Sequence, residues 1–536
     1  MRSSFWETSR TALLALCAAT SGMAVLSSGH VYGAVSQSGE QRNVVRVGHS
    51  DIQGRPAYQP NFIVYPNGRT YAFIGTHGGS RPNPLNGGAV EQNGTMIVDV
   101  TDPENPVDKF HIPVPVAGGQ AQMARLCLGS VLPKGQTGKV YLLRNVQGSS
   151  ASGYEAWDVT DVTKPALVGA MRGIRSTHKL WWECNTGIAY MPGSLDVPAS
   201  SGNLWRQDQS MVIADWSDPS KPQYIRTFGL PGAQPDGTGA VPPSLHGAIS
   251  AHEHPTRDMK LARGATVSDV IGNRVYAAWG VGDDGVMQIL DRSKLLPPAY
   301  GGSFSGSPDR PSDADLIAPV VGVLFMSPDQ GGHTSFPVFG LRPPGYQNFT
   351  EFTARDIVIV ASEATANKCQ EAPHWSFIVD VTVENSRTSP PGTRVEHNPW
   401  QGPMVLSTMS VDPRLGEKYP RGNYCGRGAR FGTHSSEENF RNPFYGKLTF
   451  IANFTGGVRV WDIREPQAPA EVGFYVPVSN ANTTADGYMT NNVEVDNRGV
   501  IYITDRNGAG LDLLVLSGRA RRIGLGQSRF GDRDDD

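Results

Sequence analysis

The chain has 536 residues, of which 62 are glycine and 40 are proline, so about a fifth of the positions hold the two strongest turn-forming residues. Charged residues make up 18%, hydrophobic residues make up 39%, and the formal net charge is −3. These values exclude a coiled coil, a long helical bundle, a membrane protein with many spans and a basic nucleic-acid-binding protein, and they favour a turn-rich β structure.

The N-terminus is typical of an export signal, which we assign to residues 1–34. Arginines flank a short polar start, and an apolar run of about 15 residues, Thr11–Leu26, follows it. That run is short for a membrane span, and Val31 and Gly33 suit cleavage close behind them. The alternative is a buried N-terminal helix. We therefore expect a periplasmic or secreted protein whose mature chain has no integral membrane segment.

One short pattern recurs along the rest of the chain, in which an apolar run ends in Asp and a polar turn ending in Pro follows. It appears as MIVDVTDPENP, EAWDVTDVTKP and MVIADWSDPSKP, with weaker copies later and a seventh run, LDLLVLSG, that lacks the turn. The recurring aspartates are Asp99, Asp158, Asp215, Asp291, Asp380 and Asp462. Their spacing of about 60 to 90 residues leaves room for about four short strands per repeat. Seven such repeats predict an all-β, seven-bladed β-propeller.

The two ends of the repeat region indicate how the ring closes. The seventh repeat lacks a fourth strand, and an unassigned strand, Asn43–Ser50, precedes the first repeat. We expect this strand to complete the last blade, so that the propeller spans residues 43–518. Residues 519–536 are highly charged and are expected to form a flexible tail without a face for the core.

The copies MIVDV, FIVDV and VWDI resemble the LVIVD repeat. The resemblance covers essentially residues 43–518, and it implies a seven-bladed propeller in an exported protein. It implies no particular activity, because a fold of this kind does not determine chemistry.

Four cysteines follow the expected signal: Cys127, Cys184, Cys369 and Cys425. In an exported protein they permit two disulfides, with three possible pairings. Cys369 and Cys425 lie in polar, loop-like stretches and are the favoured pair. Cys127 and Cys184 lie in apolar strands, where small buried residues are an equally good explanation.

Four successive blades open their inner strand with a histidine: His178, His246, His333 and His434. Equivalent positions converge on one end of a propeller axis, so these imidazoles could meet around one metal ion, iron or copper, with zinc possible. The geometry, though not the sequence, resembles that of carotenoid-cleaving oxygenases and of selenium-binding-protein-like methanethiol oxidases. The alternative is a structural hydrogen-bonding histidine that recurs from blade to blade. Blade 1 is expected to begin its inner strand near Asn61.

Other residues near these positions are weaker candidates. Four glutamates could orient the imidazole rings, although strand alternation would turn some of them away: Glu183, Glu253, Glu437 and Glu438. His77 and His374 could face the same mouth, whereas His252 and His254 are typical of a solvated turn.

Several long loops are expected on the histidine face, at residues 78–94, 192–208, 229–245, 362–373 and 412–433. Trp181, Trp182, Phe336 and Trp375 could line the mouth there, although buried strand positions are the better explanation for most of them.

The favoured function is an exported metal-dependent oxidoreductase, oxygenase-like or oxidase-like, acting on a small apolar, aromatic or sulfur-containing substrate. The alternative is a non-catalytic secreted propeller that binds a protein or a polysaccharide. Because the charges are interspersed and form no basic block, the sequence indicates no nucleic-acid partner.

Overall fold

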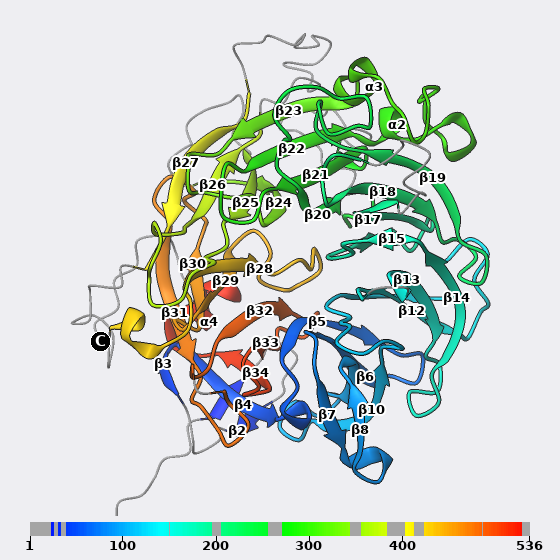
Figure 1. Cartoon of the computed structure of the whole chain (residues 1–536). Helices are drawn as coiled ribbons and strands as arrows, with labels where there is room; N and C mark the ends of the chain where they lie inside the picture. Colours follow the sequence, from blue (N-terminus) through cyan, green and yellow to red (C-terminus); the bar gives the residue numbers. More distant parts are fainter. Residues whose placement is uncertain are drawn as a thin grey trace, which may run out of the picture.

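A computed structural model describes residues 23–25, 31–33, 39–148, 151–195, 205–255, 271–343, 355–382, 402–411, 423–484 and 486–527. Within these ranges, seven antiparallel blades of four principal strands each surround one axis, and the pairing of Phe454 with Thr490 joins blades 6 and 7 into one sheet (Figure 1). The chain is therefore the all-β, seven-bladed propeller that its repeats predict. Most of the expected export signal lies outside the described residues; only β1 (Met23–Val25) and β2 (Val31–Gly33) are described there, and they pair with each other.

The blades follow one another in chain order, and each is built from the axis outward. Blade 1 consists of β5 (Ala57–Val64), β6 (Thr70–Thr76), β9 (Gly94–Asp99) and β10 (Val107–Pro113), and blade 2 consists of β11 (Ala124–Leu128), β12 (Val140–Val146), β13 (Gly153–Asp158) and β14 (Ala166–Arg172). Blade 3 consists of β16 (Trp181–Trp182), β17 (Ile188–Leu195), β18 (Ser210–Asp215) and β19 (Gln223–Phe228), and the short strand β15 (Ile174–Arg175) also pairs with β17. Blade 4 consists of β20 (Leu245–Ser250), β21 (Arg274–Trp279), β22 (Val286–Asp291) and β23 (Val320–Phe325). Blade 5 consists of β24 (Thr334–Leu341), β25 (Arg355–Ala361), β26 (Ser376–Asp380) and β27 (Met404–Met409). Blade 6 is β28 (Phe431–Ser436), β29 (Leu448–Phe454), β30 (Val458–Asp462), β31 (Ala470–Val476), extended by β3 (Glu40–Arg42), and blade 7 is β32 (Thr490–Val495), β33 (Ile501–Asp505), β34 (Leu511–Leu516), β4 (Val44–Ser50).

The second strand of a blade is buried on both faces because neighbouring blades pack face to face. Every residue of β6, β12 and β29 is buried. This packing explains why the repeats show nearly continuous apolar runs. A sheet with one solvent-exposed face would instead show alternating apolar and polar residues.

The recurring aspartate caps the turn between the third and fourth strands of a blade. The Asp99 carboxylate accepts hydrogen bonds from the backbone nitrogen and the hydroxyl of Thr101, and Asp158 does the same with Thr160. An aspartate side chain that bonds the backbone two residues ahead stabilises a turn. The repeat signature is therefore a structural device.

Strand β4 closes the ring as predicted. It pairs with β34 from Val44–Leu516 to Ser50–Leu511 and supplies the fourth strand of blade 7. The chain after β34 differs from the predicted tail, because residues 518–524 form helix α4, whose Ala520 and Ile523 are fully buried against the blade 6 and blade 7 core. Two small apolar side chains among arginines are enough to dock this turn.

Two disulfides join neighbouring blades. Cys369–Cys425 is the favoured pair, and it links the loop after β25 to η7 (Tyr424–Arg427), which precedes β28. Cys127 and Cys184, for which two explanations stood open, also form a disulfide, which joins β11 to the turn after β16.

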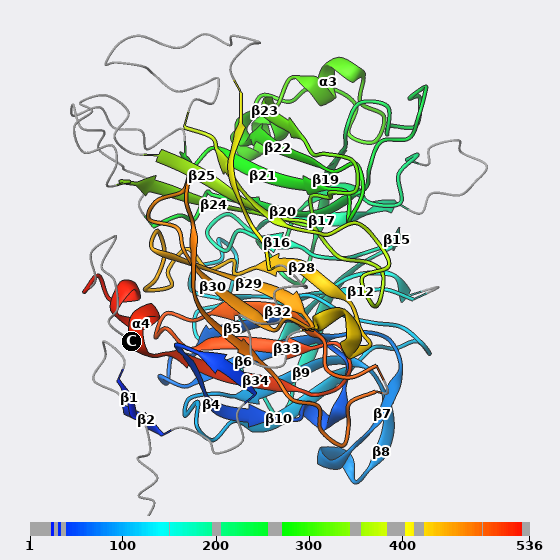
Figure 2. The ribbon, with the colours of Figure 1, turned by 90° about the vertical axis from the view of Figure 1, so that its left-hand side faces the viewer.

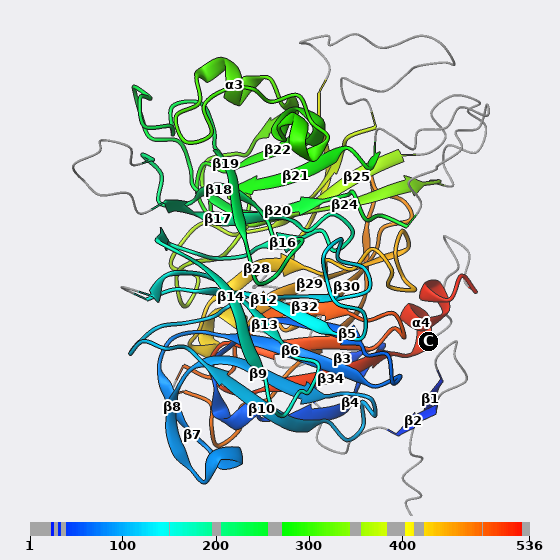
Figure 3. The same ribbon diagram turned by 90° about the vertical axis from the view of Figure 1, so that its right-hand side faces the viewer.

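The two faces of the ring carry different elements. The hairpin of β7 (Ser80–Asn83) and β8 (Ala89–Gln92) projects from one face, and α4 lies on the other (Figures 2 and 3). Among the described residues, no helix is both long enough and apolar enough to cross a membrane.

Candidate metal centre

The four histidines of blades 3 to 6 lie together at one end of the propeller axis. His246 and His434 belong to β20 and β28, and His178 and His333 lie just before β16 and β24. The ring centroids are 4.4 Å apart for His178 and His246, 3.6 Å for His246 and His333, and 4.2 Å for His333 and His434. Each ring therefore contacts the next.

The imidazoles of this cluster are neutral at physiological pH. Burial lowers the pKa of His178 to about 3, and it lowers the pKa of His246, His333 and His434 well below the ordinary value. The positive charge of Lys179 and the other histidines add to the effect of burial on His246 and His333. A neutral imidazole keeps one nitrogen lone pair, which is the form that binds metals.

Hydrogen bonds fix the orientation of two of the rings. His246 Nδ1 donates to the backbone carbonyl of His333 at 3.0 Å, and His434 Nδ1 donates to the carbonyl of Asn491 at 2.6 Å. Because a carbonyl only accepts, both Nδ1 atoms carry the proton and both Nε2 atoms keep a lone pair. Three ring nitrogens of the cluster are buried with no hydrogen-bond partner among the described residues: His178 Nδ1, His333 Nδ1 and His434 Nε2.

Glu363 adds a carboxylate to the cluster from the loop after β25. Its oxygens lie 3.4 Å from His333 Nε2 and 3.7 Å from His434 Nε2, and Arg430 Nη1 lies 2.7 Å from the same carboxylate. One donor atom each of His246, His333 and Glu363 lies within 4.8 Å of the others, a spacing that could hold a metal ion. The structure thus places a tighter set of three donors inside the four-histidine cluster.

Tyr58 of β5 occupies the centre of the cluster. Its hydroxyl lies 3.4 Å from His333 Nε2, and its ring meets the rings of His77, His178 and His434 edge-on at 5.2–5.6 Å. Burial, with the negative charge of Glu363, raises the pKa of the phenol well above its usual value of 10. The Tyr58 hydroxyl therefore stays protonated beside the histidines.

Neither Tyr58 nor Glu363 was predicted as part of the site. Strand β5 begins at Ala57, four residues before the expected start near Asn61, so Tyr58 stands level with the histidines of the other blades. Glu363 lies in one of the long loops expected on this face, but loop length alone does not single out one carboxylate.

The four glutamates expected to orient the rings bond elsewhere. Glu183 pairs with Arg292 at 2.7 Å, Glu438 with Lys179 and Arg125, and Glu253 accepts from the Asn185 backbone. Glu437 accepts from the Phe450 backbone at 2.8 Å. All four glutamates lie beyond the ends of the inner strands, where these other partners engage them, so that prediction is wrong.

Three further histidines have different surroundings. His77 lies beside Tyr58, and its Nδ1 accepts from Gln122 at 3.1 Å, so it faces the cluster as expected. His374 bonds Ser362 Oγ at 2.8 Å, one residue before Glu363. His254 is only 3% exposed and packs against Phe339 and Phe440, so the expected solvated turn is wrong for it.

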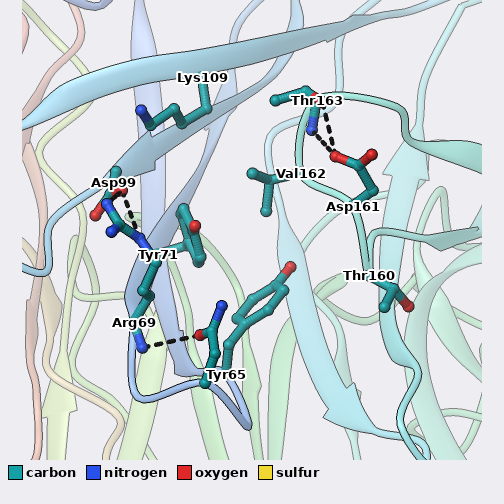
Figure 4. A pocket seen from close by; sticks show the side chains of 10 residues that line it. Tyr65, Arg69, Tyr71, Asp99, Lys109, Thr160, Asp161, Val162 and Thr163 are labelled. Carbon is teal, nitrogen blue, oxygen red and sulfur yellow. Dashed lines mark hydrogen bonds and ion pairs between the residues drawn. The ribbon is translucent and has the colours of Figure 1, made fainter.

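Three of the four aromatic residues expected at the mouth lie elsewhere. Phe336 packs against Phe440 in the core, and Trp181 and Trp182 line a cavity further along the inner strands. A separate open hollow of 520 Å³ lies between the turns of blades 1 and 2, where Arg69 and Asp99 pair with each other (Figure 4). Tyr65 and Val162 point into this hollow, which shares no residue with the histidine cluster.

No family model and no curated protein matches the chain. Among solved structures, it is similar to Sqt1 from Chaetomium thermophilum bound to the N-terminus of the ribosomal protein L10, with 12% identity over 88% of this chain and 99% of that chain and a TM-score of 0.42. It is also similar to the β-propeller domain of Cps50 (Swd1) from Myceliophteria thermophila, with 9% identity over 88% and 98% of the two chains and a TM-score of 0.42. These values carry no argument about function, and membership of the LVIVD-repeat family stays a prediction.

Proposed function

We propose that the histidine cluster binds one transition-metal ion, iron or copper, and that the protein is an exported metal-dependent oxidoreductase. The observation that carries this proposal is the contact of four neutral imidazoles from four adjacent blades, three of whose nitrogens are buried without a hydrogen-bond partner among the described residues. Imidazole is a good ligand for iron, copper and zinc. When bound, iron or copper would supply one-electron or oxygen chemistry.

The residues around the cluster support a small apolar, aromatic or sulfur-containing substrate. The ring of Phe454 lies 4.8 Å from that of His434, and the ring of Tyr58 lies 5.6 Å from it. The protonated Tyr58 hydroxyl is placed to donate a hydrogen bond to a group bound beside His333. Glu363 is placed to balance the charge of a bound cation.

Export agrees with the cysteine chemistry. Both disulfides are of the kind that persists in oxidising compartments such as the periplasm or the extracellular space. The export signal itself remains part of the proposal.

Metal content of the full-length protein, purified without a histidine tag, tests the proposed function. We expect about one equivalent of iron or copper per chain, and its loss from His178→Ala, His246→Ala, His333→Ala and His434→Ala variants taken singly. His254→Ala is the matched control, because this histidine is buried in an aromatic cluster, and it should keep the metal. Stable, metal-free wild-type protein that takes up neither ion would overturn the proposal, and stoichiometric zinc would overturn its redox part.

The second candidate function is a binding scaffold for a protein or a polysaccharide. The hairpin β7–β8 favours it, because Leu85 at its tip is 50% exposed and Val90 is 69% exposed. Large apolar side chains on a projecting hairpin are typical of contact surfaces. Leu85→Ser with Val90→Ser should leave metal content unchanged, and it should abolish partner capture if the scaffold function is the correct one.

A further inference from the structure

A cavity of about 310 Å³ opens at the end of the axial channel opposite the histidines. Residues from the inner strands of six blades, or from the turns that follow these strands, line the cavity. In each of these blades that carries one of the four histidines, the lining residues come after that histidine in the chain. Trp181 lies three residues after His178, and Glu438 lies four residues after His434. The cavity and the histidine cluster are therefore two separate sites on one axis.

The charges deepest in this cavity are already paired. Arg125 donates to the Leu180 carbonyl at 3.1 Å and to Asn61 Oδ1 at 3.2 Å, and its remaining amino group bonds Glu438. The second oxygen of Glu438 pairs with Lys179. Arg125 and Lys179 are therefore both already paired with Glu438, so neither cation is left to pair with a ligand.

Two other carboxyl groups of the lining, Glu494 and Glu253, form no close ion pair among the described residues; the charge of Arg125 reaches Glu494, and that of Arg441 reaches Glu253, only from further away. Glu494 is 2% exposed and accepts only backbone N–H groups, from Glu438 at 3.2 Å and from Val495 at 3.0 Å. Glu253 accepts from the Asn185 backbone at 3.0 Å. Burial and the nearby negative charge of Glu438 raise the pKa of Glu494 to about 7. A buried carboxylate of this kind is stabilised by an added positive charge.

The remaining lining is largely apolar and aromatic. Phe62, Trp181, Trp182 and Phe440 contribute rings from blades 1, 3 and 6. The indole nitrogens of Trp181 and Trp182 are buried without a hydrogen-bond partner among the described residues. The volume is at the lower end of what small-molecule sites have, which limits the occupant to a compact molecule.

We propose that this cavity is a binding site for a small organic cation, a primary amine that carries an aromatic or compact apolar group. The ammonium group pairs with Glu494, and the apolar group packs against Trp181 and Phe440. An anion is disfavoured because Arg125 is committed to Glu438, and because the exposed Arg441 already acts on Glu253. This inference does not depend on metal binding at the other end of the channel.

Binding of three matched probes to the full-length protein tests the proposal: 2-phenylethylamine, 2-phenylethanol and phenylacetate, followed by calorimetry and by tryptophan fluorescence. The amine should bind saturably and at least about tenfold more tightly than the alcohol or the acid, because only the amine supplies a cation that can form a close ion pair with Glu494. Glu494→Gln should reduce amine affinity by about tenfold or more while leaving the circular dichroism spectrum and the melting temperature close to wild type.

Two control variants separate this site from its surroundings. Glu437→Gln changes a neighbouring buried glutamate that is not part of the cavity lining, and it should leave amine affinity unchanged. His333→Ala should also leave amine affinity unchanged, so failure of the metal proposal and failure of this one are distinguishable. Tighter binding of phenylacetate, unchanged amine affinity in Glu494→Gln, or no saturable amine binding at millimolar concentration would each overturn the proposal.

Discussion

The His434 imidazole donates from Nδ1 to the backbone carbonyl of Asn491, 2.6 Å away in the first strand of the next blade. His246 makes the same kind of bond to the carbonyl of His333, again one blade further on. These bonds connect adjacent inner strands, and they also direct Nε2 into the cluster with a lone pair. A structural histidine and a metal-binding histidine are therefore compatible in one residue, because each function uses a different ring nitrogen.

Removing one of these inter-blade bonds should destabilise the metal-free protein. His434→Ala leaves the buried Asn491 carbonyl without its donor, which costs about 1–3 kcal/mol, whereas no side-chain hydrogen bond of His178 is present among the described residues. We expect the free energy of unfolding in urea to fall further for His434→Ala than for His178→Ala by about this amount. The two substitutions remove the same number of atoms, so equal losses would contradict a structural contribution from the Asn491 bond.

His254 should make stability depend on pH. Burial lowers its pKa to about 4 in the folded state, whereas an unfolded histidine titrates near pH 6.5. Below about pH 6.5 the unfolded state therefore binds a proton that the folded state does not, so stability falls as pH falls until the folded group also titrates near pH 4.

His254→Gln removes this proton uptake. Between pH 7.5 and pH 5, wild type should lose about 2 kcal/mol more unfolding free energy than the variant. Urea unfolding of both proteins at the two pH values measures the difference. Parallel losses in the two proteins would show that His254 titrates normally in the folded state.

Closure of the ring by β4 should be essential for cooperative unfolding. A chain that begins at residue 52 lacks β4 and exposes the edge of β34, whose unpaired backbone groups invite aggregation. We expect this chain to aggregate or to unfold in a broad transition. A chain that begins at residue 43 lacks β3 and keeps β4, and it should unfold cooperatively; normal unfolding of the shorter chain would contradict the closure.

Repetition explains which features could be predicted from the sequence. The turn aspartates and the four histidines recur at equivalent places, so each copy supports the others, and the closing strand is predicted from the strand that the seventh repeat lacks. Tyr58 and Glu363 occur once, and their part in the site depends on where β5 begins and on how one loop folds back over the axis. His254 and α4 were assigned to solvent because their neighbours are polar, but contacts with distant blades bury them.

The Cys369–Cys425 disulfide should matter more for the metal site than Cys127–Cys184. The two bridges span 56 and 57 residues, so chain entropy predicts nearly equal stabilisation, of about 2–5 kcal/mol each. Only Cys369–Cys425 ties the loop that carries Glu363 to the segment that carries Arg430, its 2.7 Å partner.

Replacing each pair by serines therefore offers a matched comparison. We expect both double variants to lose similar amounts of unfolding free energy in the metal-free state, and only Cys369→Ser/Cys425→Ser to lose about tenfold in metal affinity, the range typical for disturbed supporting contacts of a metal site. Competition with a coloured chelator measures that affinity. Equal metal affinities in the two variants would mean that Glu363 keeps its position without the bridge, because the ion pair with Arg430 and the bonds of Thr433 to Ser362 hold the loop by themselves.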